Sequence, residues 1–175
     1  PHYLKYLMNE GVQSKFVLYF HNDPLTMTGS KGLTERKYLV DICDKIVFNS
    51  LWSKKRFLQN IPSGALNSEK LIVIFQSASK NKISLKNKKK WITFVGKLNR
   101  SKGYDIFGGA VLKVLKKHKD WQAIVIGDEP RSTLHFKHDR LLNLGFLSHD
   151  KVLEIFKKTS IAVACSRWDE PLGRT

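Results

Sequence analysis

The sequence predicts an α/β fold, a doubly wound arrangement in which parallel sheets have helices on both faces. Two observations point to this class: short apolar runs recur on consecutive positions, and segments of helical period lie between them. Consecutive apolar residues are typical of strands buried on both faces, and strand–helix alternation is typical of parallel sheets. With 42% hydrophobic residues in 175, the chain also has enough apolar material to bury a core.

The individual elements follow from β-branched or aromatic runs and from apolar spacing. We predict strands at residues 16–20, 45–48, 71–75, 92–95, 123–126 and 161–165. Apolar residues three or four positions apart predict helices that include residues 39–43, 107–115 and 152–156.

A lysine-rich segment, residues 80–90, interrupts this alternation and predicts a linker. Residues 1–79 would then hold the later strands of one sheet, and residues 91–175 the first strands of another. Both ends look cut, so we expect two truncated domains.

Composition limits the classes of function. The chain has 31 Lys and Arg against 15 Asp and Glu, a net charge of +16, and no uninterrupted apolar stretch exceeds five residues. A spanning helix needs about 20 such residues, so none is predicted. Cys43 and Cys165 lack the spacing of a zinc or redox motif and are predicted to be buried free thiols, which favours a reducing, cytoplasmic location. His135 and His138 lie three apart on a predicted short helix and supply too few ligands for zinc, so no metal site is expected.

Polar residues follow the predicted strands, where open parallel sheets bind ligands. In the first half His21 follows residue 20, Asn49 follows residue 48 and Gln76 follows residue 75. In the second half Gly96 and Lys97 follow residue 95. Two such rims facing each other would form a cleft, although polar residues at strand ends also simply begin loops.

The segment 95–103, VGKLNRSKG, is the most informative of these strand ends. Gly96 allows a close backbone approach, Lys97 and Lys102 bracket the loop, and Ser101 is available to cap the following helix. Unpaired amides at a helix start together with ammonium groups are typical of an anion site. A solvated turn in a lysine-rich protein is the alternative.

The second half resembles a known family in the order of its motifs: VGKLNRSKG, IVIGDEP, LGFLSHDKVLEIFKKTSIAVACS and EPLG. This order is similar to the carboxyl-terminal domain of the retaining family 4 glycosyltransferases, also called group 1, which have the GT-B fold of two Rossmann-like domains. In the first half, FVLYFHNDP, CDKIVFNSLWSKKRFL and KLIVIFQSAS resemble the closing strands of that family's amino-terminal domain, particularly in enzymes of lipopolysaccharide and cell-surface glycan synthesis.

The resemblance implies transfer of a sugar from a nucleotide-diphosphate donor to a glycan or lipid-linked acceptor, with retention at the anomeric carbon. It implies no metal and no cofactor beyond the nucleotide sugar as co-substrate. Residues 1–79 would belong to the acceptor-side domain and residues 91–175 to the donor domain. We expect this fragment alone to be inactive.

The resemblance also assigns roles to individual residues. Lys97 stands at a family Arg and Lys102 at a family Lys, so with Gly96 they would hold the donor diphosphate. An ammonium lacks the bidentate fork of a guanidinium, so either Lys97 suffices as a point charge or Arg100 assists it. Gly127 stands where the family brings its backbone close to the nucleotide base.

Further roles fall on the end of the chain and on the first half. Glu170 matches the first Glu of a family Glu-x(7)-Glu motif that contacts the donor sugar, a position where a carboxylate suits an oxocarbenium-like transition state. The second Glu would lie beyond Thr175. Gly173 would open a helix that faces the phosphates. His21 has either a catalytic or acceptor-side role, or it merely caps its own turn.

The basic charge has three explanations. It attracts an anionic membrane leaflet, which suits a peripheral enzyme on the inner face of the membrane; it binds nucleic acid, which would make the chain a nonenzymatic module; or it reflects lysine bias. No recognised nucleic-acid motif is present, and aromatic residues are not interleaved with the basic clusters. No specific nucleic-acid partner is therefore expected.

Overall fold

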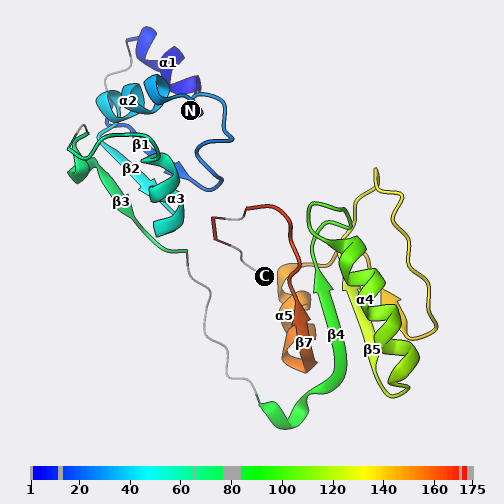
Figure 1. Cartoon of the computed structure of the whole chain (residues 1–175). Coiled ribbons are helices and arrows are strands. Elements are labelled where there is room, and N and C mark those ends of the chain that lie inside the picture. The colour runs from blue at the N-terminus through cyan, green and yellow to red at the C-terminus, as the bar shows by residue number, and fades with distance from the viewer. Residues whose placement is uncertain (1, 12–13, 65, 77–83, 170, 173–175) are drawn as a thin grey trace. The chain divides into compact units, whose positions relative to one another are not determined.

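The computed structural model describes residues 2–11, 14–64, 66–76, 84–169 and 171–172. These residues form an α/β structure with two parallel sheets, one of three strands and one of four (Figure 1). They divide into two compact units, one containing the described residues up to Gln76 together with 169, 171 and 172, and the other containing 84–168.

The first unit has a parallel sheet of strand order β1-β2-β3. Its elements are α1 (His2–Asn9), β1 (Val17–Phe20), α2 (Leu33–Ile42), β2 (Lys45–Phe48), α3 (Leu51–Phe57), a 3-10 turn (Ser68–Lys70) and β3 (Leu71–Val73).

One face of this sheet carries the core of the first unit. Phe20 and Phe48 are register partners, and their rings stack with centroids 5.6 Å apart. Leu39 of α2 and Phe57 of α3 join the same buried cluster, so these two helices cover the same face. Arg36, only 4% exposed, donates to the carbonyl oxygens of Phe57 and Gln59 and thereby satisfies the end of α3.

The second unit has a parallel sheet of strand order β6-β5-β4-β7. Its elements are a 3-10 turn (Leu85–Asn87), β4 (Lys89–Val95), α4 (Tyr104–Lys117), β5 (Gln122–Ile126), β6 (Leu141–Asn143), α5 (His149–Lys158) and β7 (Thr159–Val163). The step from β4 to β5 and the step from β6 to β7 cross the sheet in opposite directions. Right-handed crossovers therefore place α4 and α5 on opposite faces, as Figure 1 shows.

The core of the second unit lies between β4, β5 and α4. Phe94 packs against Tyr104 and Phe107, with ring centroids 5.4 and 5.2 Å away, respectively. Leu115 at the other end of α4 is fully buried. A 14-residue helix is thus fixed along the sheet, and its amino end lies beside the loop that follows β4.

All the predicted strands form, with bounds shifted by a few residues, and the predicted helices are α2, α4 and α5. The sequence analysis missed the short strand β6, the helices α1 and α3 and the two 3-10 turns. The predicted helix around His135 and His138 is wrong, because the described residues 132–138 are irregular. This segment runs over the core instead, where Leu134 and Phe136 pack against it.

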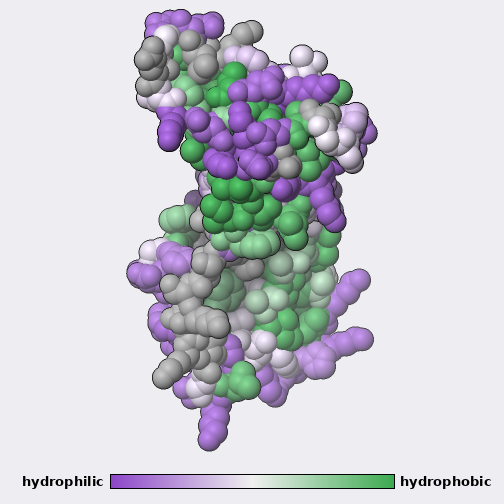
Figure 2. Space-filling view, turned by 90° about the vertical axis from the view of Figure 1, so that its left-hand side faces the viewer, coloured by the Kyte–Doolittle hydropathy of each residue, from purple (hydrophilic) through white to green (hydrophobic). Residues whose placement is uncertain are grey.

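The prediction that the strands are buried on both faces is also only partly correct. Val17 of β1 is 63% exposed and Ile161 of β7 is 45% exposed. Both strands lie at an edge of their described sheets, whereas the buried Val125 lies on the interior strand β5. Figure 2 shows hydrophobic side chains reaching the surface among the hydrophilic ones.

Candidate functional site

The ends of β4 and β5 are brought together by glycines. Gly127 has φ +133°, and a Cβ there would lie 2.0 Å from the carbonyl oxygen of Gly96, so only glycine fits. The amide of Gly96 donates to Ile126 O at 3.0 Å, and the amide of Gly127 donates to Gly145 O at 2.8 Å. The carboxyl ends of three neighbouring strands therefore meet at one rim, where the backbones of Gly96 and Gly127 are in direct contact.

The loop from Lys97 to Gly103 leads from this rim into α4, and Asn99 organises it. The Asn99 side-chain oxygen accepts from the Lys102 amide at 3.0 Å, and the Asn99 carbonyl accepts from the Tyr104 amide at 3.1 Å. Leu98 is buried beneath the loop, whereas Lys97 is exposed at its start. The loop thus places both lysines on one ordered turn at the amino end of a helix.

The predicted cap of α4 is wrong. The N-cap residue is Gly103, in the left-handed conformation at φ +72°, and no side chain caps the helix there. Ser101 instead offers its carbonyl oxygen to the amide of Arg167, at 2.8 Å. In the first turn of α4 the Tyr104 amide donates to Asn99 O at 3.1 Å, and Asp105 places a carboxylate there. Any anion bound beside this loop would therefore depend mainly on the ammonium groups of Lys97 and Lys102.

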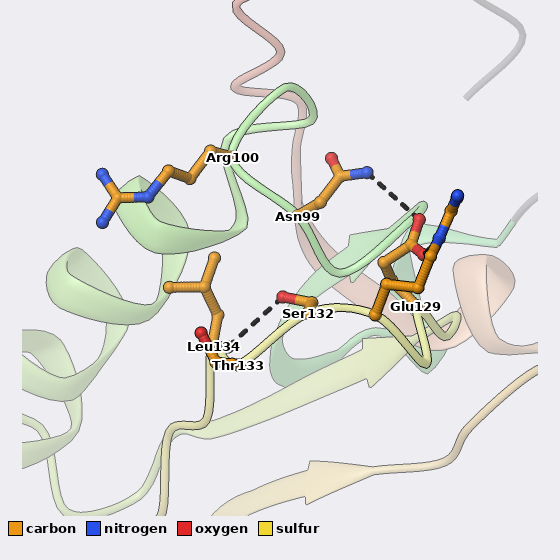
Figure 3. A pocket seen from close by; sticks show the side chains of 7 residues that line it. Asn99, Arg100, Glu129, Ser132, Thr133 and Leu134 are labelled. Atoms are coloured by element: carbon orange, nitrogen blue, oxygen red, sulfur yellow. Dashed lines mark hydrogen bonds and ion pairs between the residues drawn. The ribbon is translucent and has the colours of Figure 1, made fainter.

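Two hollows flank this loop on the side of the segment after β5. One, of about 380 Å³, is lined by Asn99, Arg100 and residues 129 and 131–134 (Figure 3). The other, of about 440 Å³, is lined by Lys97 and residues 128–131. Glu129 lines both hollows. A hydrogen bond from Arg131 lowers the pKa of the Glu129 carboxyl group, so this carboxyl group stays ionised. The Asn99 amide lies 3.4 Å from Glu129, which links the two loops.

In the first unit, polar side chains also gather where parallel strands end. Gln76 Nε2 lies 2.9 Å from His21 Nδ1, and the His21 ring meets Tyr19 edge-on. The buried Asn49 donates to the carbonyl oxygen of His21 at 3.1 Å. His21 is therefore oriented by side chains from neighbouring strand ends and remains exposed.

The predicted site residues thus have three outcomes. Gly96, Lys97 and Lys102 lie on one turn after β4, and Gly127 touches that turn. His21 belongs to the separate rim of the first unit. Glu170 and Gly173 lie outside the described residues.

The sequence analysis assigned no role to Asn99, Asp105, Glu129 and Arg167, although Glu129 and Arg167 are among the polar residues that follow predicted strands. Their roles depend on partners far away in the sequence, such as Asp105 and Arg167, whose side chains are bonded across 62 residues. Among the described residues, no cluster of three or more His, Cys, Asp or Glu side chains forms that could hold a metal ion. None of the helices in the described part of the chain is long and apolar enough to cross a membrane.

The architecture defines an α/β protein of GT-B type, in which parallel sheets present polar loops at their carboxyl ends. The sequence model of the family described as "Glycosyl transferases group 1" matches residues 75–175 of this chain. This chain belongs to that family. No curated protein sequence matches it.

Solved structures show the same fold. The UDP complex of Alr3699/HepE from Anabaena is 17% identical with a TM-score of 0.71, covering 91% of this chain and 49% of that one. A glycosyltransferase from Rickettsia africae ESF-5 is 19% identical with a TM-score of 0.67, covering 99% and 51%. The pneumococcal O-GlcNAc transferase GtfA, in complex with UDP and GlcNAc, is 14% identical with a TM-score of 0.69, covering 97% and 36%. The chain spans about half or less of the length of these proteins.

Proposed function

We propose that this chain is part of a retaining family 4 glycosyltransferase that moves a sugar from a nucleotide diphosphate to a cell-surface glycan or lipid-linked acceptor without a metal ion. In this proposal residues 91–175 belong to the donor domain, residues 1–79 to the acceptor-side domain and residues 80–90 to the linker. Family membership, the fold and the geometry of the loop after β4 support it.

One observation carries the proposal: an ordered turn holds Lys97 and Lys102 at the amino end of α4, beside the backbone of Gly96 and Gly127. The leaving group of the reaction is a diphosphate whose negative charge increases as the glycosidic bond breaks. Fixed ammonium groups and helix amides stabilise that charge in the transition state. Lys97, Lys102 and Gly96 would bind the diphosphate, and Gly127 would lie beside the nucleotide.

The remaining roles complete the proposed reaction. Glu170 would bind the donor sugar and stabilise its cationic transition state, and Gly173 would open a helix toward the phosphates. His21, held by Gln76, would act on the acceptor side. A peripheral location on the inner face of the membrane is part of the proposal, because the net charge of +16 suits an anionic leaflet.

Nucleotide binding provides the first test. HepE and GtfA are described in complexes with UDP, so UDP is the first probe, followed by GDP. We expect the chain to bind UDP more tightly than uridine in calorimetric titrations, because only UDP carries the diphosphate. Equal affinity for UDP, GDP and uridine would contradict a diphosphate site.

Lys102→Ala tests the role of the ammonium group. We expect the enzyme that contains this chain to lose activity by a factor on the order of a hundred or more, because a group that stabilises the leaving diphosphate is removed. Lys113→Ala on the exposed surface of α4 is the matched control and should leave activity unchanged. Full activity in Lys102→Ala would refute the diphosphate role.

A further inference from the structure

The loop that carries Lys97 and Lys102 is fastened to the segment after β7, residues 165–167. A Cβ at Gly103 would lie 1.9 Å from the carbonyl oxygen of Cys165, so the two backbones are in direct contact. The Cys165 thiol donates to Gly103 O at 3.1 Å, and the Ser166 hydroxyl donates to Ser101 O at 3.2 Å.

Arg167 makes most of the polar contacts of this junction. Its backbone amide donates to Ser101 O at 2.8 Å. Its guanidinium Nη1 donates to Arg100 O at 2.8 Å and to Asp105 Oδ1 at 2.7 Å, while Nη2 donates to Asp105 Oδ2 at 2.9 Å. The Arg167 side chain therefore joins the backbone of Arg100 to the first turn of α4, and the Arg167 backbone amide adds the bond to Ser101.

This arrangement differs from an ordinary surface ion pair. Isolated exposed pairs contribute little because their long side chains lose entropy and water screens their charge. Arg167 instead makes a bidentate, planar contact with a carboxylate and a charge-assisted bond to a carbonyl group, a geometry that lysine cannot reproduce. The loop lacks a side-chain cap at Gly103, so these bonds take over part of the work of fixing its conformation.

We propose that Arg167 is a positioning residue that holds the loop 97–103 in the conformation required to bind the donor diphosphate. Arg167 does not touch the phosphates in this proposal; it acts through Arg100, Ser101 and Asp105. It also lies three residues before Glu170 in the chain. The inference rests on the function proposed above.

The test compares loop dynamics with nucleotide binding in the full 175-residue chain. The variants are Arg167→Ala, Arg167→Lys and Asp105→Asn. The matched control is Asp120→Asn, which breaks an exposed ion pair with Lys90 at the opposite end of β4. Hydrogen exchange of peptides covering residues 97–103 is measured without ligand, UDP affinity is measured by calorimetry, and thermal unfolding reports on stability.

We expect faster exchange at residues 97–103 in Arg167→Ala and Asp105→Asn. UDP affinity should fall on the order of tenfold, because a small displacement of a binding group has large effects. Arg167→Lys should resemble Arg167→Ala, since one ammonium cannot serve the carbonyl and both carboxylate oxygens. Asp120→Asn should match the wild type in both measurements.

The other outcomes would contradict the role of Arg167, the role of the loop in binding, or the proposed function. Unchanged exchange in Arg167→Ala shows that the loop does not depend on Arg167. Faster exchange with unchanged UDP affinity shows that the loop conformation does not matter for binding. A melting temperature that falls in step with affinity in all variants, including Asp120→Asn, indicates a purely structural role. If the wild type binds neither UDP nor GDP, the proposed function fails, and exchange alone then decides whether Arg167 holds the loop.

Discussion

Gly103 shows how a single position can be determined by a contact from far along the chain. Its φ of +72° disfavours any L side chain, and the carbonyl of Cys165 occupies the space that a Cβ would need. The turn into α4 therefore depends on a residue without a side chain for two independent reasons, backbone conformation and direct packing.

Gly103→Ala should consequently destabilise the chain by more than the 1 to 2 kcal/mol, roughly, that a left-handed alanine costs. The loop would have to move away from Cys165, so UDP affinity should fall as well. Urea unfolding and calorimetry provide the measurements.

The matched control is Gly109→Ala, in the middle of α4, where a Cβ meets nothing within 4 Å. There alanine should stabilise by about 0.5 to 1 kcal/mol, because it restricts the unfolded chain. A loss of stability in Gly103→Ala no larger than the cost of a left-handed alanine would show that the contact with Cys165 has no energetic role.

The start of α4 combines two features that individually are weak. Asp105 lies in its first turn, where a carboxylate interacts favourably with the helix dipole, and it also accepts two bonds from Arg167. The hydrogen bonds from Arg167 lower the pKa of Asp105 to about 2. The carboxylate is therefore more stable ionised in the folded chain than in the unfolded one.

The lowered pKa of Asp105 makes the stability of the folded chain depend on pH in one direction. Because the pKa falls on folding from the ordinary value of 3.8, the contribution of Asp105 is fully present above about pH 4 and is lost as pH falls toward about 2. The difference in urea midpoint between the wild type and Asp105→Asn should be constant from pH 7 to pH 5 and shrink below pH 4. A difference that grows on acidification would contradict an ionised, hydrogen-bonded Asp105.

Over the chain as a whole, the charge of +16 leaves nucleic-acid binding as the competing function. The two functions respond differently to salt. Binding to a phosphate backbone through several lysines releases many counterions, so affinity should fall on the order of a thousandfold between roughly 50 and 200 mM salt. UDP at a site with two lysines should weaken by less than about tenfold over the same range.

We therefore expect modest salt dependence for UDP and steep dependence for any binding to a DNA duplex, both measured by titration. Lys116→Ala with Lys117→Ala, on the exposed last turn of α4, should weaken DNA binding and leave UDP binding unchanged. Tight DNA binding that survives 200 mM salt, with no binding of UDP, would favour the nonenzymatic module.

Local patterns accounted for most of the fold. The strands at residues 45–48 and 123–126 could be predicted because they lie inside their sheets. A strand buried on both faces has consecutive hydrophobic residues, which are visible in the sequence. The strand β6 escaped prediction because it is three residues long and two of them are exposed, so its sequence carries neither a run nor an alternation. The helix α3 was missed because only Ser53 and Phe57 are buried along its seven residues.

The amino-acid sequence alone determined the α/β class, the basic character and the motif order that leads to the glycosyltransferase family, since each depends on neighbouring residues or on composition. Tertiary structure decided how the loop after β4 is held. Residue 127 has to be glycine because the carbonyl oxygen of Gly96 fills the space of a side chain, and Arg167 binds Asp105, which lies 62 residues away in the sequence. Such pairings arise only when parallel strands bring distant loops to a common edge, because nothing local in the sequence marks one loop as the partner of another.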